Sequence, residues 1–278
     1  MSERTITSPD GTQIAYEQYG SGPSLVLVHG GFVDRTFWGP SVPLLTKHFT
    51  VYAMDRRGHG ASGDYPAFPA EWTLEREYED VLALLATLNE PVNLLGHSSG
   101  ARVALHAARR SPQVSRLVLY EPPLLGPVAP ETLVRLHAAL AAGDADGVVS
   151  AALGEVVGAT RNPDLPAEAR SQMLAGMRQS PVWAGALCNV RGIPAEMESY
   201  SIYRFDPAEF RDFATPTVLL LGSASGPLMR RWVEGLQAAL PCSRMMMLEG
   251  QGHGAMMEAP EVFAHTVQEA LDWLPTQD

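Results

Sequence analysis

The stretch "NLLGHSSGARVAL", residues 93–105, decides the fold. It starts as an apolar run, passes through a Gly-x-Ser-x-Gly motif centred on Ser98, and continues in a helix-like pattern. A strand that turns into a helix at a serine exposes the hydroxyl at the carboxyl edge of a sheet. Gly96 and Gly100 suit this turn, because their missing side chains let strand and helix lie close together. The motif alone is a weak signal, so Ser98 acts as a nucleophile only if the chain also supplies a base, an acid and an oxyanion site.

Apolar runs alternate with helical patterns on both sides of this stretch. The runs predict strands at residues 12–20, 24–29, 49–55, 92–97, 114–120, 216–222 and 243–250, and the patterns predict helices at residues 36–47, 73–88, 99–110 and 228–240, with a last helix ending at Trp273. Such alternation implies right-handed crossovers. It predicts an α/β fold whose sheet is mostly parallel and twisted, with helices on both faces.

The alternation stops between residues 124 and 204. This segment has no strong strand signal and contains several Ala- and Leu-rich helical pieces divided by Gly and Pro. We therefore predict a helical lid, or cap, at residues 124–204, inserted into a core domain made of residues 1–123 and 205–278. Because the lid is apolar and rich in Ala, Leu and Met, it suits an apolar acyl or alcohol group.

Composition narrows the class of protein. The 278 residues are 46% hydrophobic and 18% charged, which predicts one globular domain with a large core. A formal net charge of −11 argues against binding of nucleic acid. The start of the chain has no signal-peptide pattern, and no window reaches eighteen uninterrupted apolar residues, so we expect a soluble cytoplasmic protein that does not enter a membrane. Cys188 and Cys242 fit no metal-ligand spacing, so we expect two small buried hydrophobic residues, no metal and no cofactor.

A serine hydroxyl needs a base to take its proton and two N–H groups to hold the oxyanion. His253 follows the last predicted strand and so lies at the same sheet edge as Ser98. The other histidines stand inside glycine motifs or on helices and loops, where packed or exposed roles are the ordinary expectation. We predict His253 as the base. The N–H groups of Ser99, next to the nucleophile, and of Gly31, after the strand at 24–29, are the predicted oxyanion hole.

Four segments carry a family resemblance. "LVLVHGGFVDRTFW", "AMDRRGHGASG", "LLGHSSG" and "LEGQGHGAMMEAPEVF" follow one another in register over nearly the whole chain. They resemble the successive signature segments of the α/β-hydrolase fold superfamily. The resemblance is specific for the fold and almost uninformative about the substrate, because this fold hosts many chemistries.

The chain departs from the superfamily in its acid. Most members place the acid in the loop after the strand that is here 216–222, but residues 223–226 read Ser-Ala-Ser-Gly and contain no carboxylate. Glu121 follows the strand at 114–120, next after the nucleophile strand, and so emerges at the same sheet edge. Haloalkane dehalogenases and zearalenone-type lactone hydrolases are similar in taking their acid from this position. We therefore predict Glu121 as the triad acid, which would orient His253.

Two alternatives for the acid stay open. Glu121 could instead be a structural glutamate that caps the insertion or binds a backbone amide. Asp206 and Asp212 are rivals, but they precede a predicted strand rather than follow one.

Further residues are candidates for substrate contact or loop support. Phe32, Trp183 and Met257 are the predicted substrate contacts. The segment 181–194 around Trp183 is similar to zearalenone-type lactone hydrolases, in which a lid tryptophan packs on the substrate, although Trp183 could equally belong to the lid core. Loop support rather than substrate contact is expected of Asp34, Trp38, Asp55, Arg56 and Gly58.

These predictions favour a serine esterase or lactonase that needs no cofactor and acts on a small apolar ester or lactone. Two alternatives remain. The first is an enzyme that uses the same residues for another reaction, as a perhydrolase or haloperoxidase, a carbon–carbon bond hydrolase or an acyltransferase. The second is a receptor-like member that binds a ligand without useful turnover. Dehalogenase chemistry is disfavoured, because it needs a carboxylate where Ser98 stands. We allow for a homodimer.

Overall fold

In a computed structural model of the protein, residues 3–62, 72–124, 128–160 and 166–273 are described. Among them eight strands form one sheet: β1 (Arg4–Thr7), β2 (Gln13–Gly20), β3 (Ser24–Val28), β4 (Thr50–Met54), β5 (Val92–His97), β6 (Val114–Tyr120), β7 (Thr217–Gly222) and β8 (Ser243–Leu248). Their order is β1-β2-β4-β3-β5-β6-β7-β8. β2 is antiparallel to both of its neighbours, and all other neighbouring strands are parallel. The predicted mostly parallel sheet is confirmed.

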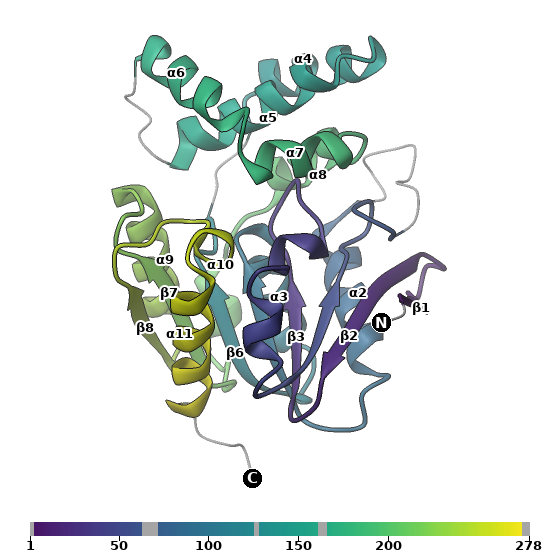
Figure 1. Cartoon of the computed structure of the whole chain (residues 1–278), viewed down its shortest axis with the longest axis vertical. Helices are drawn as coiled ribbons and strands as arrows, with labels where there is room; N and C mark the ends of the chain where they lie inside the picture. Colours follow the sequence, from purple (N-terminus) through teal and green to yellow (C-terminus); the bar gives the residue numbers. More distant parts are fainter. Residues whose placement is uncertain (1–2, 63–71, 125–127, 161–165, 274–278) are drawn as a thin grey trace.

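Helices lie on both sides of this sheet (Figure 1). Those of the core are α1 (Val42–Leu45), α2 (Leu74–Leu85), α3 (Ser99–Ala108), α9 (Pro227–Ala239), α10 (Ala255–Glu258) and α11 (Pro260–Trp273), with short 3-10 turns η1 (Arg35–Trp38) and η3 (Pro207–Phe210). Those between β6 and β7 are α4 (Pro130–Ala141), α5 (Ala145–Thr160), α6 (Ala167–Met177), α7 (Pro181–Cys188) and α8 (Ile193–Ile202).

Alternate residues of the strands are buried in two hydrophobic clusters, one on each face of the sheet. On β3, Val26 and Val28 belong to the cluster that includes side chains of α2, α3 and α9. Leu25 and Leu27 belong to the other cluster, with side chains of α1 and α11. Successive side chains of a strand point to opposite faces, so a strand covered on both sides must be apolar throughout. This is why continuous apolar runs predicted β3, β5 and β6 correctly.

The helices α4 to α8 form a layer above the sheet and its flanking helices (Figure 1). They enclose a hydrophobic cluster of their own, which contains Leu136, Val149 and Trp183. Phe32, from the loop after β3, is buried in the same cluster. The insertion therefore has its own core and is attached to the rest of the molecule at that loop. The boundaries at residues 124 and 204 stay a prediction, and its segments 125–127 and 161–165 lie outside the described residues.

Three details differ from the sequence-based expectations. The helix expected at residues 36–47 is divided into η1 and α1, because Gly39 and Pro40 interrupt it and proline has no N–H to continue a helix. β1 was not expected. An apolar run such as Met245, Met246 and Met247 predicts a buried strand; the strand is present, but these side chains are only half-buried because β8 is an edge strand.

The prediction that Cys188 and Cys242 are buried was wrong. Both are exposed, one at the end of α7 and the other just before β8. Element ends are close to solvent, and a cysteine there has no apolar surroundings to join. Within the described parts of the chain, no helix is long and apolar enough to cross a membrane.

Candidate active site

Ser98 occupies the sharp turn between β5 and α3. Its φ of 53° and ψ of −125° are unusual for a residue with a side chain, and such a conformation persists only where the surroundings hold it. A Cβ on Gly96 would lie 2.6 Å from the Cα of Ala101, and one on Gly100 would lie 2.1 Å from the main-chain oxygen of His29. The close approach of strand and helix, predicted as the reason for both glycines, is confirmed.

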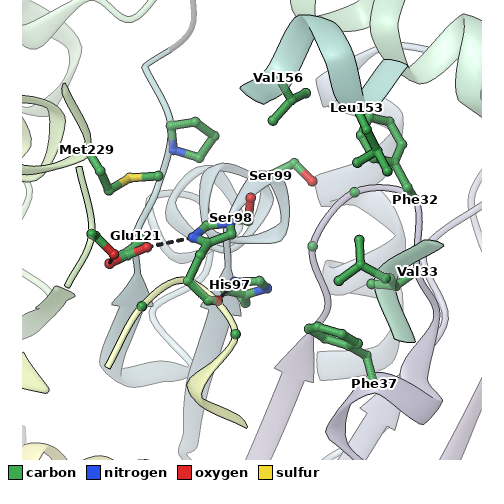
Figure 2. Close-up of a pocket in the computed structure, with 18 of the residues that line it drawn as sticks. Phe32, Val33, Phe37, His97, Ser98, Ser99, Glu121, Leu153, Val156 and Met229 are labelled. Atoms are coloured by element: carbon green, nitrogen blue, oxygen red, sulfur yellow. Dashed lines mark hydrogen bonds and ion pairs between the residues drawn. The ribbon is translucent and has the colours of Figure 1, made fainter. Parts of the chain in front are cut away.

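Glu121 follows β6 directly and contacts His253, which lies between β8 and α10. The distance between His253 Nδ1 and Glu121 Oε2 is 2.6 Å, and Figure 2 shows this contact beside Ser98. Glu121 is completely buried, whereas 41% of the His253 side chain is exposed. The imidazole can therefore meet a substrate that the carboxylate cannot reach.

The buried carboxylate of Glu121 is held in its charged form. Burial alone would raise its pKa, but hydrogen bonds with His253, Ser225 and the N–H of Gly222 outweigh burial and lower the pKa below its ordinary value. A carboxylate that stays charged stabilises a proton on the imidazole and fixes the orientation of the ring.

The end of β7 and the loop after it, where most of the superfamily carries its acid, supply hydrogen-bond donors here. The Gly222 N–H and the Ser225 hydroxyl both donate to Glu121 Oε1, at 2.8 and 2.5 Å. The rivals do not reach this place: Asp206 is exposed and caps η3 through the N–H of Ala208, and Asp212 is also exposed. Of the carboxylates weighed as the acid, the structure brings only Glu121 to His253.

Gly31 and Ser99 flank the serine from two elements. Ser99 is the first residue of α3, where N–H groups have no partner within the helix. A Cβ on Gly31 would lie 2.7 Å from the Tyr200 hydroxyl, so this position has no room for a side chain. The next N–H along the loop, that of Phe32, is already donated to Glu196 Oε2 at 3.2 Å. The geometry is consistent with Gly31 and Ser99 as the pair of donors.

One cavity of about 320 Å³ is lined by the predicted nucleophile, base, acid and oxyanion residues together. Figure 2 shows Phe32, Val33 and Phe37 on one side of Ser98 and Glu121 on the other, with Leu153 and Val156 of α5 above. This size is at the lower end of the range of small-molecule sites. The walls are mainly apolar.

Two of the three predicted substrate contacts are not in this lining. Phe32 lines the cavity, but Trp183 is buried in the cluster inside the insertion, and Met257 is half-buried against the cluster under α11. Trp183 does not face the cavity, because at the start of α7 its neighbours Ser180 and Val182 face the cavity instead.

His97 is a site residue that the sequence did not single out. It is buried, lines the cavity, and its Nε2 lies 2.9 Å from the main-chain oxygen of His253. Burial, and then the nearby His253, lower the pKa of His97 well below its ordinary value, so the ring is neutral. A carbonyl oxygen only accepts, so Nε2–H donates and holds the loop that carries the predicted base. In the sequence, the only feature that points to His97 is its position directly before Ser98.

Arg56 was expected to hold its own loop, but it reaches further. Its side chain is buried and donates to the main-chain oxygen of Gly30 at 3.1 Å and to Ser99 Oγ at 2.9 Å. Carboxylates from Glu77 and Glu196 lie on either side of it. No group of three or more His, Cys, Asp or Glu side chains that could hold a metal ion is found in the described residues.

The sequence model of the alpha/beta hydrolase family matches residues 25–266, most of the chain. The chain belongs to this family. As an alpha/beta hydrolase it has the fold that the four segments implied, and the resemblance to the superfamily is confirmed. The narrower likeness to zearalenone-type lactone hydrolases stays a prediction.

Solved and curated relatives agree with the family. An alpha/beta hydrolase from Sphaerobacter thermophilus is 33% identical, with 96% of this chain and 100% of that chain covered at a TM-score of 0.82. An enol-lactonase from Burkholderia xenovorans is 23% identical, with 97% and 100% covered at a TM-score of 0.72, which shows the shared fold. An N-formylmaleamate deformylase from Pseudomonas putida is 37% identical over 123 residues, 43% of this chain and 45% of that protein.

Proposed function

We propose that this alpha/beta hydrolase is a serine hydrolase that cleaves an uncharged, apolar carboxylic ester or lactone through an acyl-enzyme. The observation that carries the proposal is the His253–Glu121 pair, at 2.6 Å, in one mainly apolar cavity with Ser98. A nucleophile, a base within the same cavity and a third group that orients the base are the arrangement required for attack on an acyl carbon.

In the first half of the reaction, Ser98 Oγ attacks the carbonyl carbon and His253 takes the hydroxyl proton at Nε2. The charge of Glu121 stabilises the imidazolium through Nδ1. The N–H groups of Gly31 and Ser99 hold the oxygen that becomes negative. When the carbon–oxygen bond breaks, His253 returns the proton to the alcohol, which departs from an ester and stays attached to the acyl chain from a lactone.

In the second half, water replaces the alcohol. His253 takes a proton from water, the resulting hydroxide attacks the acyl-enzyme, and the same N–H groups hold the second oxyanion. Breaking the bond to Ser98 Oγ returns the proton to the serine and releases the acid. Every proton is moved by one histidine, so no cofactor is needed.

The charges in the cavity favour an uncharged substrate. The lining includes the carboxylates Glu121 and Glu258, and none of its described residues is Lys or Arg. A substrate carboxylate would lose its hydration here without gaining a cationic partner. N-formylmaleamate, the compound in the name of the Pseudomonas putida deformylase, is a carboxylate and would not suit a cavity of this charge. Trp183, which carries the likeness to lactone hydrolases, is not in the lining, and hydrolysis rates for matched esters and lactones are the measurement that separates these two substrate classes.

The test is hydrolysis of p-nitrophenyl butyrate by the wild type and by Ser98→Ala, with Ser115→Ala as the control. Ser115 lies on β6, and its hydroxyl donates to the main-chain oxygen of Val92. We expect Ser98→Ala to lose at least about 10⁴-fold in kcat while the control keeps wild-type activity. A fluorophosphonate should label Ser98 and leave Ser98→Ala unlabelled. A Ser98→Ala variant with full activity would contradict the mechanism.

A panel of acceptors separates ester hydrolysis from perhydrolysis and acyl transfer, two of the alternatives that share these residues. Peroxide and alcohols are added in place of part of the water, and the acyl products are measured. Preference for peroxide would identify a perhydrolase, and preference for an alcohol an acyltransferase. Tight binding of an ester without product, together with an unlabelled Ser98, would identify a receptor-like protein.

A further inference from the structure

Glu196 is a fully buried carboxylate on α8, inside the helical insertion, yet most of its partners belong to the core. Its Oε2 accepts the N–H of Phe32 at 3.2 Å and lies 3.3 Å from His59 Nε2. Its Oε1 lies 2.8 Å from an Arg56 nitrogen and accepts the hydroxyl of Tyr200 at 2.6 Å. A buried carboxylate without partners would be costly, so these contacts fix where α8 sits on the core.

Arg56 connects this carboxylate to both sides of the predicted oxyanion hole. One of its nitrogens donates to the Gly30 oxygen and to Ser99 Oγ and also lies beside Glu196. The Ser99 hydroxyl itself lies 3.4 Å from Glu196 Oε1. The loop after β3 and the start of α3 are therefore attached to the same pair of buried charges.

The main chain of Gly31 lies directly against α8. A Cβ built on Gly31 would be 2.7 Å from the Tyr200 hydroxyl and 3.1 Å from Glu196 Oε1. With no side chain between them, any shift of α8 reaches the Gly31 N–H. Phe32, the next residue, has a φ of 68°, a conformation that a residue with a side chain keeps only when its surroundings hold it. The bond from the Phe32 N–H to Glu196 is one such restraint.

Glu196 is charged in the folded protein. Burial raises its pKa, but the charge of Arg56 and the contacts with His59 and with the hydroxyl of Tyr200 outweigh burial and hold the pKa well below its ordinary value. A charged acceptor binds N–H donors about twice as strongly as a neutral one, which makes the contact to Phe32 a firm restraint.

We propose that Glu196 is a positioning residue that sets the oxyanion loop, so the hole is complete only when α8 of the insertion is seated on the core. This inference rests on the proposed function. It assigns the insertion a part in catalysis in addition to lining the cavity. Donors to an oxyanion act because they are already in place before the charge develops, so a displaced loop lowers kcat more than it raises KM.

The same helix offers a matched control. Glu198 is two residues away, and its Oε1 lies 2.5 Å from His137 Nε2 on α4, at the surface and away from the oxyanion loop. Glu196→Gln and Glu198→Gln thus make the same chemical change on one helix. Only Glu196→Gln places an amide where Phe32, Arg56 and Tyr200 need a charged acceptor.

The experiment measures three quantities for the wild type and both variants, after their folding is checked by circular dichroism: kcat and KM for p-nitrophenyl butyrate, the rate of fluorophosphonate labelling of Ser98, and Ki for an alkyl trifluoromethyl ketone. The ketone forms a serine adduct that carries an oxyanion. For Glu196→Gln we expect kcat and the labelling rate to fall by about 10²-fold, Ki to rise by a similar factor, and KM to stay within a few-fold. Glu198→Gln should match the wild type.

Tyr200→Phe keeps the inference testable if Glu196→Gln does not fold. It removes the 2.6 Å hydroxyl contact to Glu196 and the surface on which Gly31 rests, while the ring that lies over Arg102 remains. We expect a smaller loss of kcat with a correspondingly smaller rise in Ki. If the folded Glu196→Gln, or in its place Tyr200→Phe, behaves like Glu198→Gln, the inference is overturned. A labelled, active wild type with unaffected variants overturns this inference alone, whereas an unlabelled wild type Ser98 overturns the proposed function and this inference with it.

Discussion

The α/β core and the helical insertion differ in how they bury their side chains. In the core, each strand contributes alternate residues to two clusters, so its sequence is apolar throughout. In the insertion, the helices surround one cluster and keep their other faces exposed, as Val134 and Ile202 show. The core carries the residues proposed to do the chemistry, and the insertion carries a carboxylate proposed to position them. Catalytic residues and the residues that position them can thus come from regions whose sequences have different hydrophobic patterns.

The largest expected effect lies in the core. Glu121→Gln removes the charge that faces His253 Nδ1 and places an amide where a proton acceptor is needed. We expect a loss of about 10⁴-fold in kcat with KM little changed, measured with p-nitrophenyl butyrate on protein checked by circular dichroism. Glu249→Gln, an exposed glutamate in the loop before His253, is the control. Equal rates for the two variants would make Glu121 a structural residue.

The next effect tests the boundary between the two regions. Gly31→Ala brings a Cβ to 2.7 Å from the Tyr200 hydroxyl, so the loop or the Tyr200 side chain that contacts Glu196 must shift. We expect kcat to fall by about 10²–10³-fold, as for the loss of one oxyanion donor. Gly235→Ala, where a Cβ would meet nothing within 4 Å, should keep wild-type kinetics. If both alanine variants were equally active, Gly31 would not be under the steric restraint described.

A third effect concerns stability in acid. The folded pKa of Glu196 lies below its ordinary value of 4.5, so its contribution to stability is present above that pH and is lost as pH falls through the folded pKa. Glu196→Gln cannot titrate there. We expect it to be about 1–3 kcal/mol less stable than the wild type at pH 7, with the gap closing below about pH 4. Urea unfolding at a series of pH values measures it, and a gap independent of pH would show that Glu196 is not ionised.

The smallest effect lies wholly within the insertion. Gly176 is in α6, and a Cβ there would meet nothing within 4 Å. Gly176→Ala should stabilise the protein by about 0.5–1 kcal/mol, because alanine loses less backbone entropy in a helix. Activity should not change. Thermal unfolding and the ester assay, run on the same preparation, check both statements.

The sequence predicted those parts of the fold and site in which apolar residues form continuous runs or a helical pattern. The runs at 92–97 and 114–120 coincide with β5 and β6, and they place Ser98 and Glu121 at the ends of adjacent strands. Because the carboxyl ends of parallel strands meet at one edge, the sequence predicted both residues at the same sheet edge as His253. The contact of His253 with Glu121 agrees with that expectation.

The unpredicted part depends on contacts between distant segments. Glu196 lies in a sequence stretch with no clear helical period, and its partners come from the loops after β3 and β4 and from the start of α3. Trp183 seemed equally suited to substrate and to the lid core, and only packing places it in the latter. Local helix propensity does not indicate which buried charged residues contact one another, because tertiary packing decides these contacts.

The contact between Ser225 and Glu121 shows which positions in this fold can present a carboxylate to the same histidine. Ser225 stands in the loop that bears the acid in most of the superfamily, and its hydroxyl donates to Glu121, the carboxylate proposed as the acid, which follows the neighbouring strand. The two alternative homes of the acid are therefore adjacent in space, although they are about a hundred residues apart in the chain. A search that looks for the acid at one fixed position along the chain would therefore miss a protein that carries it at the end of the neighbouring strand, as proposed for Glu121.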